Sequence, residues 1–283
     1  GAGEYKNHRP TGAARRGLQV RVRIRFRRVD MAGRRTPAMT TIAVLADPPH
    51  PDTALPELVA DSPLSAEAAA SLYAALLRDT ALAAERSGGE LLVNYRPAEA
   101  LGLDVDSEAR LRSVLEGVID AEEVRFEVQV GETFAGRAGN TATHLLETEG
   151  VGSVGITRPE AALLARTDID SAAMKLRSTP VVLGPAPGGR VTYAAFAEPI
   201  DFGDCYAPPA VETLTDRALD VGLEVGFLES KPYLRTPADL ADLLVDVRTR
   251  RKADALVPPH LAEWVADCDL AVLADGDGLA LKG

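Results

Sequence analysis

The chain has 283 residues, with 31 Lys or Arg, 42 Asp or Glu, 46% hydrophobic residues and a formal net charge of -11 at pH 7. A chain of this length can bury a core without disulfides and holds one large or two small domains. Its acidity argues against nucleic-acid binding by the body, and its apolar runs are far shorter than the ~20 residues of a membrane-spanning helix. We therefore expect a soluble globular protein.

The charge divides the chain into two parts. Residues 1–38 hold eleven basic and two acidic residues, whereas residues 39–283 hold twenty basic and forty acidic residues. Such acidity, with many small residues and few aromatic ones, suits a halophilic protein that stays hydrated in a salt-rich cytoplasm. A genome rich in G and C is the alternative, but it explains the acidic excess less well.

The basic segment 1–38 has three interpretations. Residues 20–27 alternate apolar side chains with Arg, which is a strand pattern, but Gly and Pro surround them. The Arg15-Arg16 pair is typical of an export signal, yet the apolar stretch that such a signal needs is missing. We favour an extension upstream of a natural start at Met39. The alternative is a basic arm that binds an anionic partner.

From Thr41 onward, strand-like and helix-like segments alternate. The expected strands are 41–46, 90–95, 125–130, 151–156, 180–183, 191–197 and 223–228. The expected helices are 64–86, 107–119, 141–147, 160–165, 209–221 and 236–250. This alternation predicts an α/β fold, a single three-layer domain in which helices cover both faces of a mixed, mostly parallel sheet.

Two helix starts carry capping signals. Thr236 precedes Pro237 and lies three residues before Asp239, and Thr157 stands in the same way before Glu160. Ligands of α/β sheets bind beyond the carboxyl ends of the strands. We therefore expect the functional site in the loops that follow residues 46, 95, 156 and 183.

The pattern of residues 251–283 predicts a C-terminal extension, a helix followed by a hairpin, that packs on the domain. Leu261, Trp264 and Val265 have helical spacing, and Asp275-Gly276-Asp277-Gly278 is a hairpin-type turn between two apolar segments. This extension covers an edge of the sheet or forms the subunit contact of a homo-oligomer.

Cysteine and histidine point to no catalytic or metal site. Cys205 and Cys268 are single thiols without a CxxC motif, which suits a reducing cytoplasm. His50, His144 and His260 stand apart from one another and from any Ser or Cys motif. We therefore expect no metal or redox role for these cysteines and no catalytic role for these histidines.

Seven segments, in this order, resemble a known family. They are Pro49-His50-Pro51, 64–80, 129–137, Gly155-Ile156-Thr157-Arg158-Pro159, 183–189, 206–214 and 236–240. Together they are similar to small glycosyltransferase A-like proteins, that is, nucleotide-diphospho-sugar transferase-like proteins related to 2-phospholactate guanylyltransferase. The resemblance covers residues 40 to 250. It implies a glycosyltransferase A-type domain at 39–250, between the basic extension 1–38 and the C-terminal extension 251–283.

The chain departs from this family at its nucleotide and metal motifs. Leu55 and Glu57 occupy the two basic positions of the loop that holds phosphates in the family, and Thr157 replaces an Asp that would bind a divalent metal. Mg²⁺ prefers carboxylates together with substrate phosphates. We therefore expect no metal at the family's position. Mg²⁺ or Mn²⁺ would bind only if displaced carboxylates such as Asp201 or Asp204 served instead.

The expected site combines phosphate-binding and acceptor-binding residues. Guanidinium groups can hold a diphosphate in bidentate geometry. We assign Arg137, Arg158, Arg235 and Thr157 to nucleotide and phosphate binding, and Gly188, Gly189 and Tyr206 to an acceptor loop. The resulting hypothesis is a nucleotide-sugar-dependent glycosyltransferase or nucleotidyltransferase that needs no metal. The alternative is a catalytically inactive binding or assembly module with the same fold.

Overall fold

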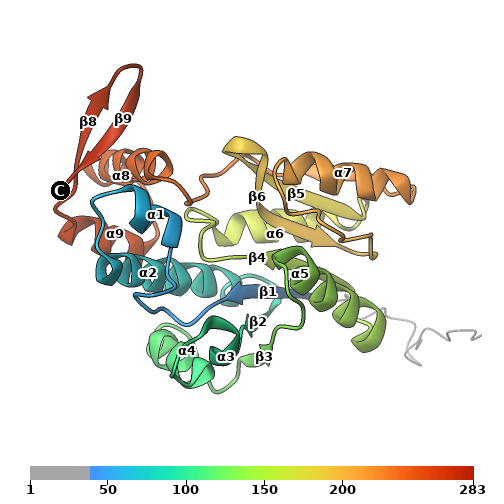
Figure 1. Ribbon diagram of the computed structural model, residues 1–283. Coiled ribbons are helices and arrows are strands. Elements are labelled where there is room, and N and C mark those ends of the chain that lie inside the picture. The colour runs from blue at the N-terminus through green and yellow to red at the C-terminus, as the bar shows by residue number, and fades with distance from the viewer. Residues whose placement is uncertain (1–38) are drawn as a thin grey trace, which may run out of the picture. The chain divides into compact units, whose positions relative to one another are not determined.

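Seven strands form one mixed sheet in the computed structural model, which describes residues 39–283 (Figure 1). Their order is β3-β2-β1-β4-β6-β5-β7, and β6 runs antiparallel to β4 and β5 while the other pairs are parallel. The strands are β1 (Thr40–Ala46), β2 (Glu90–Tyr95), β3 (Arg125–Val128), β4 (Ser153–Thr157), β5 (Val181–Ala186), β6 (Arg190–Phe196) and β7 (Val225–Phe227). The expectation of a mixed, mostly parallel sheet is confirmed. The strand pattern at 20–27 lies outside the described residues.

Helices cover both faces of this sheet. One buried cluster joins Ile42 and Val44 of β1 to α2 (Ala66–Glu85), α4 (Ser107–Leu115) and α6 (Arg166–Lys175). A second cluster joins the alternate β1 residues Ala43 and Leu45 to α5 (Phe134–Thr143) and α7 (Ala210–Asp220). Because successive strand residues point to opposite faces, β1 takes part in both clusters and is buried throughout.

The C-terminal segment adds a third cluster outside these layers. It consists of α8 (Pro237–Lys252), α9 (Pro259–Asp267) and the hairpin of β8 (Ala271–Asp275) and β9 (Gly278–Lys282). Leu244 of α8 and Leu261 of α9 are buried together with Leu72 of α2 and with Leu58 of the short helix α1 (Pro56–Asp61). This segment therefore packs on α1 and α2. No helix in residues 39–283 is long and apolar enough to span a bilayer.

One helix prediction and one capping prediction are wrong, and another predicted helix begins earlier than expected. The predicted helix 160–165 is a loop, and α6 begins only at Arg166. Thr157 does not cap a helix, because it is the last residue of β4 and its Oγ1 donates to the carbonyl of Thr192 on β6 at 2.7 Å. The predicted helix 141–147 starts earlier, at Phe134, where the Thr133 side chain accepts from the Gly136 amide at 3.0 Å. From there it continues as a π-helix at His144–Glu149.

A glycine of β4 allows close packing between strands. A Cβ atom at Gly155 would lie 1.9 Å from the hydroxyl oxygen of Tyr193, which is buried on β6.

Two further short helices, α3 (Ala98–Leu101) and the 3-10 turn η2 (Pro187–Gly189), complete the described elements. Strand β6 runs antiparallel to β4 and β5. Its first residue, Arg190, therefore lies directly after the η2 turn, at the edge of the sheet where the parallel strands end.

Candidate functional site

A small cavity lies at this edge of the sheet, beyond β4 and beside the start of β6. Its volume is about 60 Å³, and its wall includes three arginines, Arg158, Arg190 and Arg235, and two tyrosines, Tyr206 and Tyr233. Three chain segments far apart in sequence therefore bring guanidinium groups to one place. No carboxylate belongs to this wall.

Each of the three guanidinium groups pairs with a carboxylate that does not line the cavity. Arg158 pairs with Glu160, Arg190 donates to Asp239 at 2.9 and 3.0 Å, and Arg235 donates to Glu57 through two hydrogen bonds of 2.7 Å. Burial is the largest influence on Arg158 and opposes its charge, but Glu160, Tyr233, Tyr73 and Asp47 together outweigh burial and hold the pKa of Arg158 above its ordinary value. These pairs orient the arginines and offset part of their charge.

Aromatic rings form another part of the wall. The Arg158 guanidinium carbon lies 4.5 Å from the centroid of the Phe134 ring, and the ring of Tyr206 meets Phe134 edge-on at 4.9 Å. The hydroxyl of Tyr206 is buried and has no hydrogen-bond partner within residues 39–283, and burial raises the pKa of this phenol well above its ordinary range. An unpaired buried hydroxyl costs free energy unless a ligand or water satisfies it.

Arg137 lies near this cavity but does not line it. Its Nε donates to Oε1 of Gln129 at 2.7 Å and its Nη1 donates to the carbonyl of Glu132 at 2.8 Å, so among the described residues neutral groups alone bind this buried cation. Burial, and then the charge of Arg96, lower the pKa of Arg137. Arg137 therefore adds a positive charge near the cavity that no carboxylate of residues 39–283 pairs with.

Arg96 follows β2 directly and pairs with Asp47, which follows β1. Its Nε donates to Oδ1 of Asp47 at 2.7 Å, and the Asp47 amide donates to the hydroxyl of Tyr73 on α2 at 3.0 Å. Burial raises the pKa of Tyr73 well above its ordinary range. The ends of β1 and β2 thus carry one cation and one anion, which bind each other.

Only one of the three predicted acceptor residues lines the cavity. Tyr206 lines the cavity, whereas Gly188 and Gly189 form the η2 turn behind Arg190 and are not part of the wall. Gly189 has φ +68°, and a Cβ there would lie 2.9 Å from Cβ of Pro209. The predicted residues Thr157, Arg158 and Arg235 also line the cavity.

Sequence reasoning missed Arg190, Tyr233, Phe134 and Arg96. Arg190 directly follows the Gly188-Gly189 pair. If the strand that begins there had been predicted as antiparallel, its first residue would have been expected at the same edge of the sheet as the other site residues. Arg96 and Asp47 are the first residues after two predicted strands. Nothing in the local sequence marks Tyr233 or Phe134.

The residues around the cavity do not fit a divalent metal. Thr157 uses its hydroxyl within the sheet, and each nearby carboxylate is bound to an arginine. Asp201 accepts from the Gly203 amide and pairs with Arg217 at 3.2 Å, and neither Asp201 nor Asp204 lines the cavity. Residues 39–283 contain no group of three or more His, Cys, Asp or Glu side chains able to hold a metal ion.

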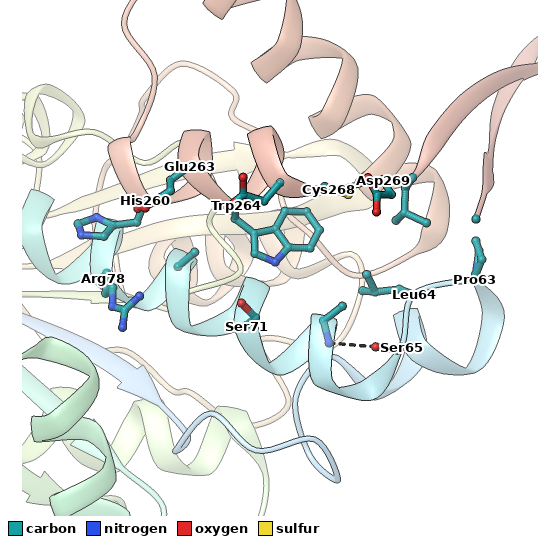
Figure 2. Close-up of a pocket in the computed structure, with 15 residues that line it drawn as sticks. Pro63, Leu64, Ser65, Ser71, Arg78, His260, Glu263, Trp264, Cys268 and Asp269 are labelled. Carbon is teal, nitrogen blue, oxygen red and sulfur yellow. Dashed lines mark hydrogen bonds between the residues drawn. The ribbon is translucent and has the colours of Figure 1, made fainter.

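A larger cavity lies elsewhere, between α2 and α9. Its volume is about 590 Å³, and Figure 2 shows the indole of Trp264 over Ser71, with Arg78 and His260 toward one end and Cys268 and Asp269 toward the other. None of its residues belongs to the arginine cavity. A site chosen by cavity volume alone would therefore not be the one at the strand ends, where the arginines converge.

Comparison with known proteins supports the fold. No family model and no curated protein matches the chain. A solved structure described as a "putative nucleotide-diphospho-sugar transferase" from Desulfovibrio desulfuricans G20 is similar to it, with a TM-score of 0.63 and 17% identity over 81% of this chain and 98% of that one.

Two further solved structures match less closely. A cytidylyltransferase from Leptospira borgpetersenii has a TM-score of 0.45 and 10% identity over 81% of this chain and 94% of its own. A CMP:2-keto-3-deoxy-manno-octonic acid synthetase complexed with CTP has a TM-score of 0.43 and 11% identity over 76% of this chain and 99% of its own. The sheet order, the helical layers and the first of these three similarities together establish a nucleotide-diphospho-sugar transferase-like fold for residues 39–283.

Proposed function

We propose that the arginine cavity binds phosphate groups of a nucleotide or nucleotide-sugar, and that the chain transfers a glycosyl or nucleotidyl group from that donor without a metal held by its own carboxylates. One observation carries this proposal: three guanidinium groups line a cavity whose wall has no carboxylate and contains an unpaired buried tyrosine hydroxyl. Phosphate oxygens accept from guanidinium and from phenol, so a phosphate would satisfy both.

The electrostatics around the cavity favour an anion. Arg137 is buried without a carboxylate, and the charges of Arg96 and Arg158 both lower its pKa. A bound phosphate would relieve this repulsion, and guanidinium pairs supply the positive charge that a metal provides in other diphosphate sites.

The size of the cavity determines how a nucleotide would bind. Its 60 Å³ is small beside the roughly 300–1,000 Å³ of pockets that enclose whole ligands. The cavity can take a phosphate group, while the nucleoside must lie outside it. Because Glu57 holds Arg235 at the exposed rim, we expect a diphosphate to displace this carboxylate.

A binding or assembly module without catalysis is the second candidate. It is favoured by the pairing of Arg158, Arg190 and Arg235 with Glu160, Asp239 and Glu57, because neutralised arginines bind a donor weakly. The two candidates differ in turnover. A transferase consumes its donor in the presence of an acceptor, whereas a binding module leaves the donor intact.

The test is a thermal-shift scan of the full chain against UDP-, GDP- and dTDP-sugars and free nucleotides, each with and without Mn²⁺. Ligand at a hundredfold excess over its Kd stabilises by ~2.7 kcal/mol, which such a scan detects. We expect stabilisation by one nucleotide without Mn²⁺. The stabilising donor is then incubated with the full chain and candidate acceptors, and chromatography measures how much donor is left. A transferase consumes the donor, whereas a binding module leaves it intact.

Arg235→Ala is the matched variant for this scan, because Arg235 lies at the exposed rim and its loss should not unfold the chain. We expect it to weaken nucleotide binding at least tenfold. Arg177→Ala, which removes an exposed arginine after α6 that has no ion pair among the described residues, is the control. Equal effects of the two variants, or stabilisation only with Mn²⁺, would contradict the arginine-based site.

A further inference from the structure

A third cavity lies between the C-terminal end of α2, the loop before α6, the segment 229–232 and the segment 256–259 after α8. Its volume is about 430 Å³, within the roughly 300–1,000 Å³ range of small-molecule pockets. It shares no lining residue with the arginine cavity or with the cavity at Trp264. It therefore requires an explanation of its own.

The charge of this cavity is opposite to that of the chain around it. Residues 39–283 contain twice as many acidic as basic residues, yet four basic side chains line this one cavity: Arg86, Arg166, Lys231 and Arg250. Of its two carboxylates, Asp79 is buried and bound to the amides of His260 and Leu261, so only Glu229 remains to offset them.

The acidic partners of these cations lie outside the cavity wall. Arg166, Lys231 and Arg250 pair with Asp170, Asp168 and Asp246 at 3.1, 3.6 and 2.7 Å, and none of these three carboxylates lines the cavity. Arg86 has no hydrogen bond or ion pair from its side chain within residues 39–283. Each cation therefore keeps N–H donors for a ligand.

The remaining wall is aliphatic. Leu82, Leu163, Leu164 and Val257 line it, and the side chain of Leu256 beside them is 95% exposed. Exposing a whole leucine to water forfeits the free energy that its burial would give. An aliphatic ligand tail would cover this surface.

We propose that this cavity binds an aliphatic organic anion, with its tail against Leu256 and Val257 and its carboxylate or phosphate head between Arg86 and the other three cations. The shared chemistry is an acyclic apolar chain that ends in a negative group, whether a fatty carboxylate or an alkyl phosphate ester. This proposal is independent of the nucleotide site, since the two cavities have no residue in common.

The test is calorimetric titration of the full chain with octyl phosphate, octanoate and octyltrimethylammonium, all below their micellar concentrations. We expect at least one of the two anions to bind at least tenfold more tightly than the cation of equal chain length. The ratio between octyl phosphate and octanoate then identifies the head group. Equal binding of all three compounds, or no binding of either anion, would overturn the proposal.

Two variants at exposed positions test the two halves of the site separately. Arg86→Glu should weaken anion binding at least tenfold, and Leu256→Ser should weaken it several-fold, with unchanged circular dichroism because both side chains are exposed. Arg177→Glu and Leu219→Ser make the same changes at exposed positions away from the cavity. An effect of these controls as large as that of the site variants would show that the binding is not at this cavity.

Discussion

Arg235 donates two hydrogen bonds of 2.7 Å to the carboxylate of Glu57, which joins the loop before α8 to α1 across 178 residues of sequence. These hydrogen bonds lower the pKa of Glu57 and raise that of Arg235. Both side chains are about half exposed, and Arg235 lines the arginine cavity whereas Glu57 does not. The Glu57 carboxylate thus occupies the Nε and Nη2 donors of Arg235, and a phosphate that bound this edge of the guanidinium group would compete with it.

The first prediction follows from this competition. Glu57→Gln removes the competing charge, so we expect nucleotide binding to tighten about tenfold, which corresponds to about 1.4 kcal/mol. Titration calorimetry with the nucleotide found in the thermal scan measures the change. Asp61→Asn removes an exposed carboxylate from the same short helix and is the control.

The pH dependence of binding checks the same competition. The pKa of Glu57 lies below its ordinary 4.5, so its carboxylate is charged at neutral pH. The group loses this charge only as the pH falls through the lowered pKa. The competing ion pair is therefore present throughout the range from pH 6 to 8, and we expect no contribution of Glu57 to the pH dependence of binding there. If Glu57→Gln weakened binding, Glu57 would be part of the site rather than its competitor.

Asp79 supports the second prediction, which concerns stability. This buried carboxylate on α2 accepts from the amides of His260 and Leu261 at 3.1 and 2.7 Å and contacts the His260 ring at 2.9 Å, so it holds the first turn of α9. We expect Asp79→Ala to lower the free energy of unfolding by about 2–3 kcal/mol, because it leaves buried helix amides unpaired. Urea unfolding followed by circular dichroism measures this loss.

Asp106 provides the comparison for Asp79. It accepts from the Ala109 amide at 2.9 Å at the exposed start of α4. Asp106→Ala should therefore cost only about 1 kcal/mol, as exposed caps do. A loss at Asp79 no larger than that at Asp106 would mean that water replaces the carboxylate at α9.

The sequence predicted the strands and one helix cap well because these depend on local patterns. Thr236 accepts from the Asp239 amide at 3.2 Å, as its spacing indicated. The same spacing failed at Thr157, where pairing with β6 governs the residue instead. Local spacing cannot show whether a hydroxyl lies within a sheet.

The candidate site was only partly predictable from the sequence. Arg158 and Arg235 lie in loops that follow or precede predicted elements, and the structure places both at one cavity. Arg190 was missed because its position depends on the antiparallel direction of β6, which is set by sheet topology. Asp239 holds Arg190 as well as capping α8, and no local pattern reveals such a double role.

The third prediction concerns the two thiols. Cys205 is fully buried, and burial raises its pKa to about 12, whereas Cys268 is partly exposed. Because the thiolate is the reactive form, only about one Cys205 thiol in ten thousand is ionised at pH 8. We expect a disulfide reagent to titrate one fast thiol in the folded chain, with Cys205 reacting only in denaturant. Cys268→Ser should abolish the fast phase, and loss of that phase in Cys205→Ser instead would show that Cys205 is accessible.

The fourth prediction concerns salt. Residues 39–283 carry forty acidic and twenty basic residues, so unfavourable repulsion acts across the folded surface at low ionic strength. Raising KCl from 0.1 to 3 M shortens the Debye length from ~10 Å to below ~3 Å and removes most of this repulsion. Exposed ion pairs such as Arg235–Glu57 also weaken, but each contributes only about 0–1 kcal/mol. We therefore expect the Tm of the full chain to rise by several degrees, while a parallel scan of a protein with near-zero net charge corrects for the general effect of KCl. A Tm that is unchanged or lower in 3 M KCl would show that the acidic composition is not an adaptation to salt.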